Sequence, residues 1–144
     1  MDNDNIDASA AIATTKISGT AVNLSSEQTI TGVKFFDKAT KSKLTTDTDA
    51  STVTFDLDAS NLHTVTLGGN RTLALSNADT GQVFVIRLVQ DGTGSRTVTW
   101  FSTIKWPAGT APTLSTAINK VDVFGFICTG SGTYDGFIVG QGLS

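Results

Sequence analysis

Few residues of this chain have the types and spacing that catalysis requires. The chain contains one histidine, one cysteine and one glutamate, namely His63, Cys128 and Glu27. Nucleophilic catalysis needs an oriented base beside the nucleophile, and His63 is the sole imidazole for that role. His63 lies in a predicted strand with Val65 and Leu67 on its own face, which favours a structural or merely exposed histidine. Cys128 lies in an apolar segment and is interpreted as a small core residue.

Acidic residues could act in pairs or bind calcium. Asp56 and Asp58 share one face of a predicted strand, and a solvated polar face explains them better than a pair of glycosidase carboxylates. Asp47 and Asp49 are spaced like calcium ligands, but the third acid, the glycine and the final glutamate of such a loop are missing. A single histidine also excludes a metal site with two histidine ligands. We therefore expect no catalytic residue, no metal and no cofactor, and we expect that the protein is not an enzyme.

Aromatic side chains in loops are the best candidates for ligand contacts. Trp106, beside Pro107 in a long irregular stretch, and Tyr134, near the last turn, could stack on sugar rings. Trp106 has an alternative role, which is to anchor its loop on the core. Trp100 alternates with Val98 and is interpreted as core. The candidate glycan contacts are therefore Trp106 and Tyr134.

The composition favours a β protein. The chain has 144 residues, of which 24 are threonine and 14 are glycine, and threonine is β-branched and common in strands. The net charge is −3 without a basic cluster, which argues against nucleic-acid binding. The apolar runs are far shorter than the roughly 20 residues that span a bilayer, so we expect no membrane insertion. The first residues lack the pattern of a signal peptide, which predicts synthesis in a cytoplasm without export.

The chain divides near residue 50. Residues 1–50 contain few large apolar side chains, too few to offset an ordering entropy of roughly 1–2 kcal/mol per residue. We interpret this part as an extended arm for attachment or trimerisation, although a flexible tail is the alternative. Its widely spaced apolar residues could line a multi-chain stalk or dock on another protein. The candidate anchors are Ile6, Ile12, Ile17, Val22 and Ile30.

Residues 51–144 carry the strand patterns. Apolar and polar residues alternate from Thr52 to Leu57, as in a half-buried strand. Residues 63–67 and 71–75 alternate in the same way and flank Gly68-Gly69-Asn70, which predicts a hairpin.

The segment from Gln82 to Gln90 is apolar on both faces, apart from Arg87, so we expect a central strand covered on both sides. One cover would be the second sheet, and the other would be the arm or a neighbouring subunit. Val121–Thr129 and Tyr134–Gly140 predict a last hairpin. No repeat of fixed period is found. The predicted fold is all-β, an antiparallel β-sandwich or small barrel at residues 51–144, preceded by the extended N-terminal arm.

Two groups of short motifs resemble phage proteins. The segments 13–21 and 28–36, with Thr15-Lys16-Ile17-Ser18-Gly19 in the first, resemble phrases common in bacteriophage fibre and appendage proteins. Four further segments, 94–100, 104–106, 109–114 and 121–124, resemble a β-domain of phage virion proteins. Together the motifs cover roughly half of the chain.

The resemblance implies a non-enzymatic, homotrimeric virion protein made in the host bacterial cytoplasm. A short chain that starts at methionine suggests a capsid decoration protein, head fibre or spike module anchored by its arm. The alternative is a host-receptor or carbohydrate-binding domain of a tail fibre. The implied partners are further copies of the chain, capsid or tail proteins, and host surface glycans, with no nucleic acid among them.

Overall fold

A computed structural model describes residues 33, 35–101 and 103–144. The chain forms two compact units, Met1–Ala39 and Thr40–Ser144, which are described separately. The described residues contain nine strands, a short 3₁₀ turn at Pro107–Gly109 and no α-helix, and all the strands belong to the second unit. The strands are β1 (Leu44–Thr46), β2 (Thr52–Asp56), β3 (Leu62–Leu67), β4 (Arg71–Ser76), β5 (Val83–Gln90), β6 (Val98–Thr99), β7 (Ile104–Lys105), β8 (Val121–Gly130) and β9 (Thr133–Leu143).

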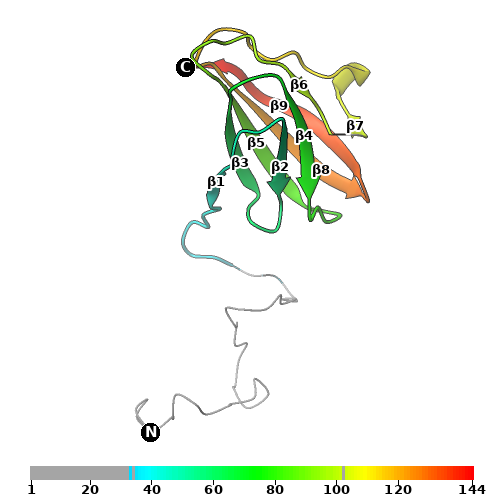
Figure 1. Cartoon of the computed structure of the whole chain (residues 1–144). Helices are drawn as coiled ribbons and strands as arrows, with labels where there is room; N and C mark the ends of the chain where they lie inside the picture. Colours follow the sequence, from blue (N-terminus) through cyan, green and yellow to red (C-terminus); the bar gives the residue numbers. More distant parts are fainter. Residues whose placement is uncertain (1–32, 34, 102) are drawn as a thin grey trace, which may run out of the picture. The chain divides into compact units, whose positions relative to one another are not determined.

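The strands form two sheets that enclose one core. The larger sheet has the order β1-β3-β5-β8-β9-β7, and the smaller has the order β2-β4-β6. Consecutive strands from β1 to β6 alternate between the two sheets, and within each sheet these six strands pair with one another in parallel. This part is therefore a flattened coil of three turns, with one strand of each turn in each sheet (Figure 1). The β8–β9 hairpin then extends the larger sheet antiparallel to β5.

The all-β prediction is confirmed, but the sheets are mixed and not purely antiparallel. Antiparallel pairing occurs between β5 and β8 and between β8 and β9, whereas the other pairings are parallel. The predicted hairpin of residues 63–67 and 71–75 is wrong. These residues form β3 and β4, which lie in opposite sheets, and Gly68-Gly69-Asn70 carries the chain from one sheet to the other. Leu67 and Leu73 are therefore both buried in the core between the layers.

The first coil turn begins inside the part of the sequence that was assigned to the arm. Residues 44–46 form β1, and Leu44 pairs with Leu62 of β3. The predicted boundary at residue 50 therefore falls between β1 and β2. The five candidate anchors of the arm lie outside the described residues. The described residues of the first unit include Val33, Phe35 and Phe36, each of which is at least 73% exposed.

The core of the coil follows the predicted alternation. Val53 and Phe55 of β2 are buried, as the pattern from Thr52 to Leu57 predicted. They pack in one cluster with Leu67 of β3 and with Phe84 and Ile86 of β5. β5 is central, as predicted, with β3 on one side and β8 on the other.

The hairpin half of the larger sheet is covered by a loop. The smaller sheet has three strands against six, so side chains between β6 and β8, among them Trp100, Trp106 and Leu114, supply the second layer here. Trp106 packs over Gly136 of β9, where an added Cβ would lie 2.7 Å from the indole. The predicted hairpin is confirmed as β8 and β9, and Cys128 is a buried core residue as predicted.

Candidate functional site

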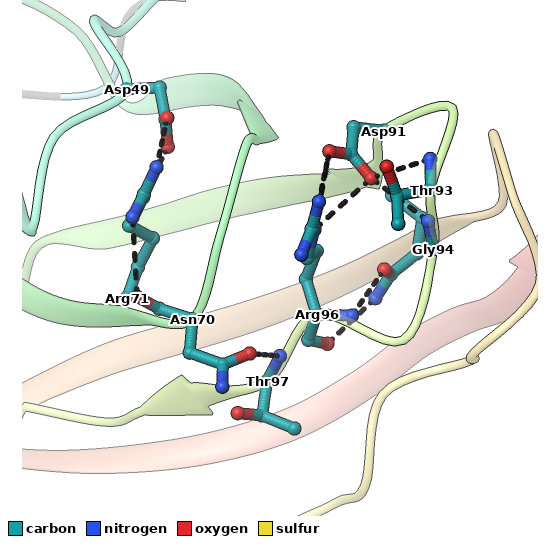
Figure 2. A network of polar contacts seen from close by, with 9 residues as sticks. Asp49, Asn70, Arg71, Asp91, Thr93, Gly94, Arg96 and Thr97 are labelled. Carbon is teal, nitrogen blue, oxygen red and sulfur yellow. Dashed lines mark hydrogen bonds and ion pairs between the residues drawn. The ribbon is translucent and has the colours of Figure 1, made fainter.

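Three turns at one end of the coil are joined by polar contacts (Figure 2). Arg71, which follows the turn between β3 and β4, donates from Nε to an oxygen of Asp49 at 2.7 Å, and Asp49 lies in the turn between β1 and β2. The Asn70 side-chain oxygen accepts from the backbone N–H of Thr97, which precedes β6, at 3.0 Å. Each turn is thus tied to the next along the stack.

The third turn is organised by Asp91. Its carboxylate accepts hydrogen bonds from Arg96 at 2.8 Å and from the backbone N–H groups of Thr93 and Gly94 at 2.9 Å. The pKa of the Asp91 carboxyl group is lowered to about 2, and the hydrogen bond from Arg96 is the largest cause of this shift. Gly94 has a φ of +73°, and an added Cβ would lie 2.6 Å from a backbone oxygen, so only glycine fits there.

The charges of these turns are paired with one another. The hydrogen bond from Arg71 lowers the pKa of Asp49 and raises the pKa of the guanidinium, and Asp91 raises the pKa of Arg96 in the same way. Both guanidinium groups are bound to a carboxylate through two nitrogens. Because its charges are paired in this way, we interpret the network as one that stabilises the three turns.

The single histidine is structural. His63 is fully buried, its Nδ1 lies 3.0 Å from a carboxylate oxygen of Asp47, and its Nε2 lies 2.9 Å from the carbonyl oxygen of Ser60. Both ring nitrogens therefore have a polar partner within the fold. The Ser60 hydroxyl donates to the carbonyl of Lys43. These contacts fasten the residues around β1 to β3 and leave His63 no nucleophile to activate.

Three of the four carboxylates considered for calcium and for acid–base chemistry have other partners, and the fourth, Asp58, is exposed. Asp47 binds His63, and Asp49 binds Arg71. Asp56 accepts from the Asn77 amide at 2.7 Å. Within the described part of the chain, no three side chains of the types His, Cys, Asp and Glu gather closely enough to hold a metal ion.

The two candidate glycan contacts belong to one aromatic cluster. Trp106 is half-buried, and its ring centroid lies 5.0 Å from that of Trp100 and 5.7 Å from that of Phe126. It therefore anchors its loop, as the alternative interpretation proposed. Tyr134 is 6% exposed and lies 5.1 Å from Phe101, and its burial raises the pKa of the phenol. Binding of a glycan by Trp106 or Tyr134 stays a prediction.

Trp100 lines two hollows that the sequence did not indicate. One has a volume of about 380 Å³ and is bordered by Thr72 and Ala74 of β4 together with Trp100, Phe101 and Tyr134. The other has a volume of about 260 Å³, and its lining includes Trp100, Arg96, Val98, Pro112 and Leu114. Trp100 was interpreted as core because it alternates with Val98. Its place beside the hollows depends on the small width of the second sheet, which no local pattern reveals.

The matching family is a phage one. Residues 44–133 match the family model described as "Putative phage tail fibre C-terminal domain", which is more than half of the chain. The chain belongs to this family. No curated protein and no solved structure matches it. The predicted resemblance to phage appendage proteins is thereby confirmed.

The tail fibre domain begins at the first residue of β1 and ends at the first residue of β9. It therefore includes the whole three-turn coil, the aromatic loop and β8. Membership of the tail fibre family makes the protein a structural component of the virion. No helix in the described part of the chain is long and apolar enough to cross a membrane.

Proposed function

We propose that this protein is a non-enzymatic, homotrimeric module of a phage tail fibre, attached to the particle through the residues that precede β1. The observation that carries the proposal is the tail fibre match over residues 44–133. The match favours a place on the tail over the capsid decoration, head-fibre or spike roles that the short chain suggested. The exposed side chains of Val33, Phe35 and Phe36 support a segment that binds another protein, since isolated chains gain nothing from exposed aromatic residues.

Antibody labelling of purified virions tests this placement. An antibody raised against the β-domain should mark the tail in electron micrographs, and labelling should disappear from particles that lack the gene. Labelling of the head alone would contradict the tail placement. Particles without any label would contradict a virion role for this chain.

We propose the absence of enzymatic activity because the side chains that could act as acids or bases are already bound to other groups of the chain. His63 is enclosed between Asp47 and Ser60, and Asp122 is buried while it accepts from Ser115 and Gly142. General acid–base chemistry needs such groups to reach a substrate. Incubation with host surface polysaccharides should therefore release no new reducing ends, and their release would contradict the proposal.

Carbohydrate binding is the second candidate function, with the host glycan as the partner. The hollow of about 380 Å³ combines aromatic side chains with the exposed Thr72 at its border, which suits the apolar and hydroxyl faces of a sugar. Thr72→Val keeps the shape but removes the hydroxyl, so it should weaken binding in a glycan array without affecting the fold. Thr93→Val, at a solvent-exposed turn away from this hollow, serves as the matched control. Equal binding by the wild type and Thr72→Val would remove this hollow from consideration.

A further inference from the structure

The outward face of the larger sheet is apolar and uncovered. In β5, Phe84, Ile86 and Leu88 are buried in the core, so the alternate residues of the strand point away from it. Directly paired residues of neighbouring strands share a face, which places side chains of β1, β3, β8 and β9 beside them. The apolar members of this outward face include Leu44, Leu62, Val83, Val85, Val89, Val121, Val123, Ile127 and Phe137.

Several of these side chains are open to solvent. Val83 is 53% exposed, Ile127 38% and Phe137 39%. Phe137 lies across Gly125, where an added Cβ would come within 2.2 Å of the ring, so the phenyl group extends the apolar surface from β9 over β8. A monomeric protein rarely presents so continuous an apolar surface, and none of the described residues of the β-domain covers it.

Arg87 and Asp135 lie apart on this face, and Lys105 of β7 lies on it next to Asp135. Arg87 of β5 is half-buried, and its guanidinium group donates a hydrogen bond of 3.3 Å to the Thr64 hydroxyl. It forms no ion pair with the residues that the structure describes. Asp135 of β9 pairs in register with Ile127 and with Lys105 of β7, and it too has no ion pair in that part of the chain.

Arg87 and Asp135 cannot neutralise each other within one chain. Arg87 pairs with Val123 of β8, whereas Asp135 pairs with Ile127. They are therefore two strands apart across the sheet, or roughly 10 Å, and about 13 Å apart along β8. A guanidinium group that becomes buried without a partner is costly, so whatever covers this face has to bring a carboxylate to Arg87.

We propose that the occupant of this face is a second copy of the chain, with Arg87 of one copy paired to Asp135 of the next. A surface that holds both charges at different positions is complementary to itself. In a ring, the Arg87 side of each copy meets the Asp135 side of its neighbour, which closes the assembly with the same contact at every interface. The inference rests on the proposed homotrimer and specifies the surface that builds it.

Charge reversal tests the contact. Arg87→Glu and Asp135→Arg should each weaken assembly at least tenfold in sedimentation of the full chain, because each places like charges together at the interface. The double variant R87E/D135R should assemble like the wild type. Asp79→Arg reverses an exposed charge in the loop before β5 and should leave assembly unchanged. Circular dichroism melting shows whether each variant keeps its fold.

An uncharged position provides a second test. Val83→Asp adds a charge to the apolar face at an already exposed site at the start of β5, so the monomer should fold while assembly is lost. Ile118→Asp, at a position 56% exposed in a loop outside this face, is the matched control. Normal assembly of Val83→Asp or of both single charge variants would overturn the proposal, and would show that another partner or the N-terminal residues cover the face.

The outcomes separate this proposal from the one on which it rests. If the wild type and all the variants form the trimer, this face is not the interface, but the chain is still a homotrimer. Failure of R87E/D135R to restore the assembly lost by each single variant rejects the ion pair. A wild-type chain that remains a monomer rejects the homotrimer itself.

Discussion

The three-turn coil and the β8–β9 hairpin are stabilised by different means. The coil consists of strands of two to eight residues that pair in parallel with strands from the neighbouring turns. The hairpin consists of strands of 10 and 11 residues that pair along their length, and its inner face is covered by aromatic side chains. The coil therefore adds polar contacts between its turns to its buried apolar core, whereas the hairpin depends on close aromatic packing.

The largest loss of stability is expected from a substitution among the aromatic side chains that cover the hairpin. Phe126 is fully buried, and its ring centroid lies 5.1 Å from that of Phe84 and 5.7 Å from that of Trp106. Phe126→Ala should lower the free energy of unfolding by about 3–5 kcal/mol, because it leaves a cavity in the cluster. Urea denaturation measures the loss. The exposed Ile118→Ala should change stability by less than about 0.5 kcal/mol. A loss below about 1 kcal/mol for Phe126→Ala would contradict a packing-dependent hairpin.

The next largest loss of stability is expected from a substitution in the first turn of the coil. Asp47→Asn leaves the buried His63 without its carboxylate partner and should cost about 2–4 kcal/mol. Hydrogen exchange should show weaker protection in β1 and β3, while β8 and β9 are less affected. Equal loss of protection in the coil and the hairpin would mean that the two halves do not differ as described. Asp58→Asn, an exposed acid with no ion pair among the described residues, is the control.

A third substitution tests how closely the loop packs on the hairpin. Gly136→Ala brings a Cβ to 2.7 Å from Ile104 and from Trp106, and it should cost about 1–3 kcal/mol. Gly92→Ala is the control, because nothing lies within 4 Å of its added Cβ. In a double-mutant cycle, Trp106→Leu should reduce the cost of Gly136→Ala. Independent effects of these two substitutions would argue against the contact.

The smallest effect is a dependence of coil stability on pH. Asp91 has a pKa of about 2 in the folded chain against an ordinary value of 3.8. Because the folded pKa is lower, the Asp91–Arg96 contact stabilises the fold above about pH 4 and loses this contribution as the pH falls toward 2. Asp91→Asn should therefore be less stable than the wild type at pH 7 but similar at pH 2. Melting curves at these two pH values measure the difference, and a constant gap would contradict it.

The sequence revealed those parts of the fold that depend on neighbouring residues. Alternation located β2 because inward and outward residues follow one another along the strand, and a run that is apolar on both faces located β5. The last hairpin was likewise visible as two apolar strands around a glycine-rich turn. The pairing of β3 with β5 depends on residues 23 apart, such as Leu62 and Val85, while Leu44 and Leu62 of the preceding pair are 18 apart. Because the turns of the coil differ in length, the sequence shows no repeat of fixed period. Without such a repeat, two strand patterns on either side of a glycine turn favour a hairpin.

In the candidate site, too, the sequence revealed only what depends on neighbouring residues. The core roles of His63 and Cys128 could be inferred from the faces of their own strands. The ion pair between Asp49 and Arg71 joins turns that are 22 residues apart, and no spacing rule predicts it. The apolar outward face was foreseen in part, because β5 is apolar on both sides and a second cover was expected. Which residues of β8 and β9 complete that face depends on the strand register.

Sedimentation equilibrium of the full chain at micromolar concentration tests the central claim most directly, namely that this tail fibre module works as an assembly of identical copies. The account predicts a single species with three times the mass of one chain. A well-folded species with the mass of one chain, at every concentration measured, would contradict it.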